Sequence, residues 1–149
     1  MVTTEDIKNL RDQTGLSVMQ CKSALEEAGG DKTKALAILK AKGADIAAKK
    51  SGRDLGAGTV VAYIHANGTV GTLLELLCET DFVAKNPEFK ALAYDIAMHV
   101  AAMKPETSEE LSTQAFIKDP ARTIGDLVNG AVQKFGERTE VGHFVRFSI

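Results

Sequence analysis

The apolar residues of the first fifty positions recur at helical spacing in three short segments. Each segment starts at a residue that caps helix N-termini and stops at a glycine. The capping residues are Thr3, Ser17 and Asp31, and the glycines are Gly15, Gly29 and Gly43. Asp6 and Gln20 complete capping boxes with the first two caps. Helices of about three turns are marginal in isolation, so the pattern predicts a three-helix bundle over residues 1–50.

A glycine-rich stretch separates this bundle from the rest of the chain. Residues 51–58 read Ser-Gly-Arg-Asp-Leu-Gly-Ala-Gly, the only linker-like composition in the sequence. We therefore predict three parts: the bundle at 1–50, a linker at 51–58 and a second domain at 59–149.

After the linker the hydrophobic period changes from helical spacing to alternation. Residues 59–65 and 69–79 are rich in strand-forming residues and flank Asn67-Gly68, a pair typical of tight hairpin turns. Alternate positions of the second run predict one buried face, made of Val70, Thr72, Leu74, Leu76 and Cys78.

Asn86 and Pro87 are typical of a helix start, and the helix is expected to reach Met103. The predicted core face consists of Phe89, Leu92, Ala93, Ile96, Val100 and Met103. A second apolar stripe, which needs cover from another element or from a partner, consists of Tyr94, Met98, Ala101 and Ala102.

The remaining segments are shorter. The pattern predicts a loop or short helix at 106–114, a short strand at 115–118 and a helix at 123–134. It also predicts a strand at 141–149 that alternates through Val141, His143 or Phe144, Val145 and Phe147. Strands and helices do not alternate regularly, so the predicted class is α+β, with a three-helix bundle followed by an antiparallel sheet packed with helices.

Charge and composition exclude several classes of protein. The 149 residues include 18 basic and 20 acidic side chains, whereas a nucleic-acid-binding surface needs clustered positive charge. No run of about 18 apolar residues could span a membrane, and the first residues lack the pattern of a signal peptide. We expect a cytoplasmic protein, although a mature organellar protein would look the same. Cys21 and Cys78 are expected to be buried, reduced thiols.

The sequence contains no recognisable catalytic or metal-binding pattern. His65, His99 and His143 do not have the spacing of metal ligands, and no glycine-rich phosphate loop is present. We therefore expect no enzyme, no metal and no cofactor. His99 lies at the edge of a predicted core face, where it is either a hydrogen-bonded structural residue or a polar contact to a partner.

The stretch from Thr80 to Asn86 is unusual for a connection between a strand and a helix. It places Asp81 directly before two large apolar residues, Phe82 and Val83. Either both apolar side chains fold inward to seal the corner, or an acid and an aromatic ring are presented to another protein.

The motif Thr80-Asp81-Phe82-Val83-Ala84-Lys85-Asn86 resembles the signature of the translation elongation factor Ts family, the guanine-nucleotide exchange factors of elongation factor Tu. Further segments similar to the family, in the same order, are residues 10–15, 18–25, 42–50, 96–106, 123–127 and 144–147. The family usually carries an additional helical segment where residues 107–120 stand here, so the chain looks like a shortened form.

This resemblance implies a fold, a partner and functional residues. The first fifty residues would form a bundle of the ubiquitin-associated type. Residues that match Asp81 and Phe82 enter the nucleotide-binding domain of Tu beside its magnesium site, and the residue that matches His99 contacts the same domain. The positions of the N-terminal bundle that dock nearby match Arg11, Val18 and Met19.

Two other functions and one question of assembly stay open. A non-catalytic adaptor could use the three-helix bundle to bind another protein, and a small enzyme could be built around His99 and a carboxylate. Self-association is also open, because the second apolar stripe of the long helix could face another copy of the chain.

Overall fold

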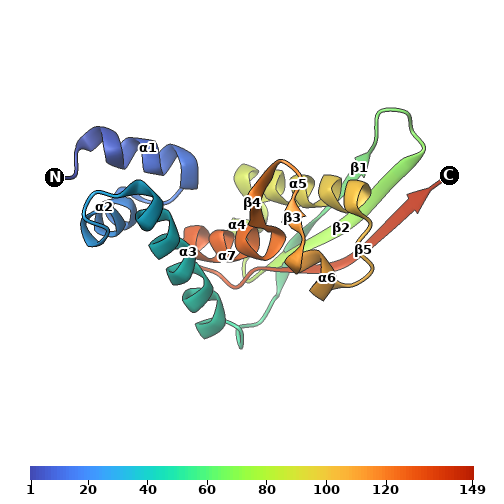
Figure 1. The fold of residues 1–149 in the computed structure, drawn as a ribbon. Helices are drawn as coiled ribbons and strands as arrows, with labels where there is room; N and C mark the ends of the chain where they lie inside the picture. Colours follow the sequence, from blue (N-terminus) through green and yellow to red (C-terminus); the bar gives the residue numbers. More distant parts are fainter.

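Three helices form the N-terminal part of the computed structural model, which describes residues 1–149 (Figure 1). They are α1 (Thr4–Thr14), α2 (Val18–Glu27) and α3 (Lys32–Lys49). The predicted caps are confirmed: Thr3 and Ser17 form capping boxes, and the Asp31 side chain accepts from the Lys34 amide. We call residues 1–50 the three-helix module.

A small apolar cluster of its own holds the three-helix module together. Seven residues are buried in it: Leu10, Leu16, Cys21, Ala24, Leu25, Ala35 and Leu39. They come from all three helices and the α1–α2 turn, so each short helix is stabilised by packing rather than by its own propensity.

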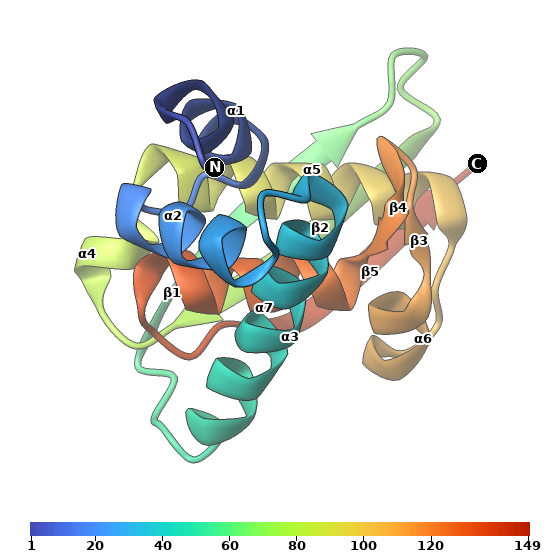
Figure 2. The same cartoon turned by 60° about the vertical axis from the view of Figure 1, so that its left-hand side comes forward.

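Helix α3 is longer than the sequence predicts, because the predicted end at Gly43 is wrong. The helix continues to Lys49, and Gly43 is buried inside it. A Cβ at this position would lie 2.8 Å from Gln133 Oε1 and 3.5 Å from the Asn129 carbonyl oxygen, both in α7 (Ile124–Phe135). This glycine therefore permits close helix packing. Figure 2 shows α3 lying across α7, and Lys40 pairs with Asp126 there at 3.2 Å.

The second part of the chain is built on a three-stranded antiparallel sheet, which confirms the α+β class. Its strands are β1 (Ala57–Ile64), β2 (Val70–Cys78) and β5 (Glu140–Ser148), in the order β1–β2–β5. The predicted hairpin is confirmed, with β1 starting two residues earlier than expected. The division of the chain into domains at 50 and 58 stays a prediction.

One face of the sheet is covered by α5 (Pro87–Met103) together with α7. The alternation of β2 is confirmed, since Thr72, Leu74, Leu76 and Cys78 are all buried. Fourteen residues form this core, and the α5 side chains in it are Phe89, Ala93, Ile96, Ala97 and Val100.

One prediction about α5 needs correction, and the structure decides part of another that was open. Met103 is 45% exposed rather than part of the core, because the helix ends there beyond the packed region. The second apolar stripe is partly covered by the chain itself: the Tyr94 ring packs edge-on against Tyr63 of β1, and Ala101 is buried. Arg146 of β5 also donates to the Ala101 carbonyl at 2.9 Å.

The other face of the sheet, which we call the open face, carries exposed apolar side chains. These include Val60, Ile64, Leu73, Val145 and Phe147. The predicted alternation of β5 through Val141, His143 or Phe144, Val145 and Phe147 is wrong, because the register shifts opposite Glu75. Val141 and Phe144 therefore both pack against the core, and Phe147 lies on the open face.

The connection between α5 and α7 contains one element that the sequence did not reveal. The short helix α6 (Ser108–Thr113) and strand β3 (Ala115–Phe116) agree with the prediction, but β3 pairs with a further strand, β4 (Asp119–Thr123). This strand contains Pro120, which argues against a strand on sequence grounds. None of the helices is long and apolar enough to cross a membrane.

Substitution of two helical glycines tests the packing of α3 on α7. We expect Gly43→Leu to lower the free energy of unfolding by about 1–3 kcal/mol, because the side chain has no space between the helices. A Cβ at Gly130 of α7 meets no atom within 4 Å, so Gly130→Ala should raise stability by up to about 1 kcal/mol. Urea unfolding followed by circular dichroism measures the free energy of unfolding of both variants. A Gly130→Ala variant less stable than the wild type would contradict the conclusion that this position has open space.

Candidate protein-interaction site

The predicted motif forms a tight corner between β2 and α5. Cys78 ends the strand, Thr80 precedes a single helical turn, α4 (Asp81–Ala84), and Asn86 caps α5 through a 2.8 Å hydrogen bond from the Glu88 amide. We call residues 79–84 the β2–α4 corner. Every peptide group of this corner lies next to a regular element, so its backbone has little freedom.

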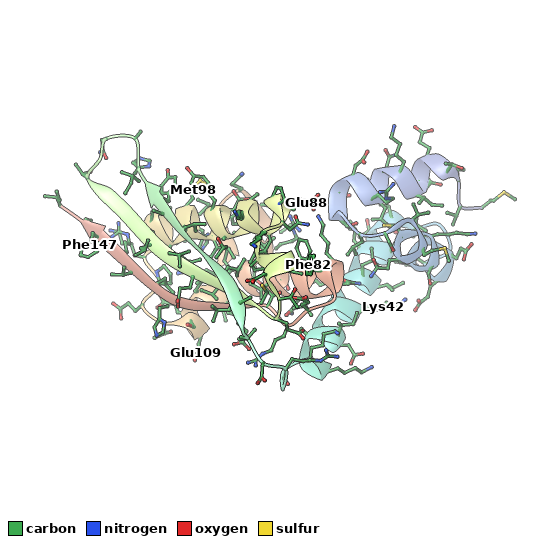
Figure 3. All side chains as sticks on the ribbon, turned by 180° about the vertical axis from the view of Figure 1, so that it is seen from behind. Lys42, Phe82, Glu88, Met98, Glu109 and Phe147 are labelled. Atoms are coloured by element: carbon green, nitrogen blue, oxygen red, sulfur yellow. The ribbon has the colours of Figure 1, made fainter.

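The two large apolar residues of the motif differ in their exposure to solvent. Val83 is buried in the core, whereas Phe82 is 92% exposed and Asp81 is also exposed (Figure 3). The alternative in which both side chains seal the corner is therefore wrong for Phe82. Single exposed apolar residues are common, so exposure alone assigns no role. What distinguishes Phe82 is its place on a backbone fixed by the burial of the two residues that follow it.

A carboxylate from the far end of the chain holds the β2–α4 corner. Glu137 Oε1 accepts from the backbone N–H groups of Glu79 at 3.1 Å and Thr80 at 2.9 Å. Glu137 Oε2 accepts from the Thr80 hydroxyl at 2.6 Å. Burial of the neighbouring Cys78 thiol, together with the Glu137 charge, raises the pKa of that thiol. Glu137 was not among the predicted site residues, because nothing in the sequence shows which distant amides a carboxylate will reach.

The three predicted residues of the three-helix module all lie on its surface. Val18 is 47% exposed and Met19 72% exposed, and both stand in the first turn of α2. The Ser17–Gln20 capping box fixes this turn. Arg11 is exposed in the last turn of α1. The module therefore offers a cation and two apolar side chains to solvent.

Lys134 of α7 lies between the three-helix module and the end of the core that carries the corner. Its ammonium group forms an ion pair with Glu88 in the first turn of α5. The same group lies beside Gly15, where an added Cβ would come within 2.9 Å of it. Partial burial lowers the pKa of Lys134. Figure 3 shows Phe82 and Glu88 at the end of the core nearest the module.

His99 does not lie with the other predicted site residues. It stands roughly 18 Å along α5 from Pro87, given the rise of an α-helix. Its side chain has no solvent exposure and makes two hydrogen bonds, one of 2.9 Å to Gln114 Oε1 and one of 3.3 Å from the Ile117 amide to Nδ1. The ring is therefore a structural tie to the β3–β4 region. A direct contact from this residue to a partner stays a prediction, and in this structure no atom of the ring reaches the surface.

No group of three or more histidine, cysteine, aspartate or glutamate residues is arranged to hold a metal ion. What the structure offers is two exposed protein surfaces, the β2–α4 corner and the start of α2.

Comparison with known proteins identifies the family. The sequence profile described as "Elongation factor TS" matches residues 46–110 and 79–149. Elongation factor Ts of Leptospira biflexa is 39% identical over 193 aligned positions, covering 99% of this chain and 98% of that protein. The chain belongs to the elongation factor Ts family. It is therefore grouped with the translation elongation factors.

Other members of the elongation factor Ts family show the same relationship. The protein of Carboxydothermus hydrogenoformans is 40% identical, covering 100% of this chain and 89% of its own length. That of Pseudothermotoga lettingae is 45% identical, covering 91% of this chain and 76% of its own length. The alignment to the Leptospira relative runs over 193 positions although this chain has 149 residues, so the chain lacks an internal segment, as predicted.

The buried state of His99 leads to a prediction about pH. Nδ1 accepts a hydrogen bond from Ile117, and burial holds the pKa of the imidazole below its usual range. In the unfolded chain the ring takes up a proton near a pH of about 6.5, whereas in the folded chain it does not. The contribution of the neutral His99 ring to stability is therefore fully present above this pH. The free energy of unfolding should fall as the pH is lowered to about 5.5.

Denaturant titrations at several pH values measure this effect. In His99→Gln the side chain does not titrate, so its stability profile should be flatter between pH values of about 7.5 and 5.5. Equal slopes in the two proteins would mean that His99 takes up its proton in the folded state.

Proposed function

We propose that this protein binds elongation factor Tu in its GDP-bound form and promotes the release of GDP. Membership of the elongation factor Ts family supports the choice of partner. The observation that carries the proposal is the exposure of Phe82, 92% accessible beside an acidic residue on a backbone that the core fixes. Because this backbone is already fixed, only the ring itself has to be ordered when it enters a partner.

The proposed mechanism is displacement at the magnesium and phosphate site of Tu. Burial of a phenylalanine side chain contributes roughly 1.5–3 kcal/mol, which is available to separate elements that hold the nucleotide. The Asp81 carboxylate arrives beside it and places a negative charge near the bound cation. A thousandfold loss of nucleotide affinity requires about 4 kcal/mol, within reach of several such contacts. Coupling is reciprocal, so rebinding of nucleotide weakens the complex equally and releases the factor.

The three-helix module supplies affinity in this proposal. Arg11, Val18 and Met19 would dock on a helix of the nucleotide-binding domain, and the packing of α3 on α7 holds the module against the core. Exchange requires no covalent step, so we propose that the protein is not an enzyme in the sense of bond chemistry and uses no cofactor. The proposed location is the cytoplasm, where translation elongation takes place.

Removal of the Phe82 ring tests the central claim. We expect Phe82→Ala to lose most of the acceleration of GDP release, roughly a factor of 10 or more if about 1.5–3 kcal/mol of burial is lost. Smaller losses are expected for Asp81→Ala and His99→Ala. The measurement is release of labelled GDP from Tu by stopped-flow fluorescence. Phe147→Ala, which removes a 73% exposed ring from the open face, is the matched control and should keep the wild-type rate.

Each result of this experiment points to one interpretation. If the wild-type protein binds Tu or another protein without accelerating GDP release, the adaptor function is favoured. If Phe82→Ala is as fast as the wild type, the ring is not the element that acts on Tu.

A substitution in the three-helix module should change affinity rather than the maximal rate. We expect Met19→Asp to raise the concentration for half-maximal exchange about tenfold, the equivalent of about 1.4 kcal/mol, because it puts a charge into an apolar contact. Met103→Asp, at a 45% exposed methionine outside the module, is the control. A lower maximal rate with unchanged half-maximal concentration would contradict the docking role.

Self-association stays a prediction. Light scattering of the purified chain over a range of concentrations measures it. Comparison with Phe147→Ser then shows whether the open face takes part, since Phe147 is the most exposed ring on that face.

A further inference from the structure

The β2–α4 corner lacks the local cap that would ordinarily hold such a turn. Thr80 occupies the N-cap position of α4, yet its side chain makes no hydrogen bond to the α4 backbone. Its hydroxyl instead donates to Glu137, and the same carboxylate accepts two backbone N–H groups from residues 79 and 80. Three hydrogen bonds to one carboxylate therefore hold the two residues that precede α4, and hydrogen bonds to a carboxylate are about twice as strong as neutral ones.

The arrangement is reciprocal. The Glu79 side chain, only 15% exposed, accepts through Oε2 from the Arg138 backbone N–H. Each of two segments, residues 79–80 and residues 137–138, thus gives a carboxylate to the other's backbone. We call these contacts the glutamate clamp.

The position of Glu137 is set by the packing of α7. The helix ends at Gly136, whose φ of 73° turns the chain so that the next residue leaves the helix axis. The preceding Phe135 ring packs edge-on against Phe89 of α5, with ring centroids 5.9 Å apart. The glutamate clamp therefore fixes the position of the corner relative to the packed helices α5 and α7, rather than relative to the β1–β2 hairpin from which the corner emerges.

Arg138 and Arg53 extend the clamp to the connection that leaves the three-helix module. The Arg138 guanidinium donates to the Arg53 carbonyl, and the Arg53 side chain lies 3.4 Å from Glu79 Oε1. The connection between α3 and β1 is thus tied to the clamp through Glu79 and Arg138.

We propose that Glu137 is a positioning residue, which fixes the direction in which the β2–α4 corner presents Asp81 and Phe82 to the partner. This inference rests on the proposed function. Phe82 is almost fully exposed, so its direction comes from the backbone of residues 80–84 alone. Holding that backbone fixed keeps the ring aimed at one point of the partner, so that its binding energy acts on the elements that hold the nucleotide.

A purely structural role for Glu137 predicts different behaviour. A less stable protein would lose activity through its unfolded fraction, whatever residue stands at position 82. A positioning role predicts a loss that depends on the Phe82 ring. Residues that act as one unit show such non-additivity in double-mutant cycles.

The experiment compares three clamp variants with a distant control. Glu137→Ala removes all three hydrogen bonds, Glu137→Gln keeps an oxygen for the two amides, and Thr80→Val removes only the hydroxyl donor. Glu109→Ala, at an exposed glutamate of α6, is the control. The full-length chain is used throughout, and circular dichroism confirms that each variant is folded at the assay temperature. Thr80→Val provides the test if Glu137→Ala does not fold.

The first measurement requires no partner. Hydrogen exchange of the Glu79 and Thr80 amides, followed by NMR, should be about tenfold faster in Glu137→Ala, equivalent to about 1.4 kcal/mol of protection. Exchange in Glu137→Gln should stay close to the wild type. Unchanged exchange in Glu137→Ala would overturn the clamp itself.

The second measurement is the rate of GDP release from Tu as a function of factor concentration. Glu137→Ala should lower the maximal rate about tenfold and leave the half-maximal concentration within about twofold of the wild-type value. The maximal rate of Glu137→Gln should be near that of the wild type, and that of Thr80→Val should lie between those of Glu137→Ala and Glu137→Gln. In a protein that already carries Phe82→Ala, adding Glu137→Ala should lower the maximal rate by less than about a further twofold. Additive losses, or a change in half-maximal concentration alone, would overturn the positioning role.

The two measurements separate this inference from the proposed function. A wild-type protein that does not accelerate GDP release disproves the exchange function, and the amide measurement still decides whether the clamp exists. A wild-type protein that accelerates release while Glu137→Ala is equally fast disproves the positioning role alone.

Discussion

The pairing of β2 with strands on both sides is the constraint on which the rest of the molecule depends. One neighbour, β1, comes from the adjacent hairpin, whereas the other, β5, comes from the end of the chain. The buried face of β2 sets where α5 packs, and its last residues set where the exposed corner begins. A shift of β2 by one residue would exchange its buried and open faces and move the corner with them.

In this arrangement a rigid core and a small helical module each provide part of the proposed binding surface. The core holds one aromatic ring outside its surface, on a backbone fixed by buried neighbours and by a distant carboxylate. The module has its own apolar cluster and meets the core along α3 and α7. Since the Gly43 contact sets the distance between these helices, it also influences how far the module stands from the corner.

Local signals predicted most of the fold, whereas the candidate site residues came from the resemblance to the family. The capping residues, the Asn67-Gly68 turn and the Asn86-Pro87 start act within a few positions, so they can be read directly from the sequence. The motif around Phe82 likewise identified the exposed corner. The resemblance to the family, carried by several motifs in order, predicted the family and the missing internal segment.

The failures share a physical cause, since each depends on a contact between segments far apart in the sequence. Gly43 stops no helix because α7 packs closely against it, which offsets a helix penalty of about 1 kcal/mol. Glu137 caps amides 57 and 58 residues away, and no spacing rule can reveal such a pairing.

The C-terminal origin of both β5 and Glu137 affects how the protein acquires its shape during synthesis. The three-helix module can bury its own cluster as soon as residues 1–50 have left the ribosome, since domains fold as units from the N-terminus. The sheet lacks its third strand, and the corner lacks its carboxylate, until the last part of the chain has emerged. The nascent chain therefore folds its module before it can fix the aromatic ring in place.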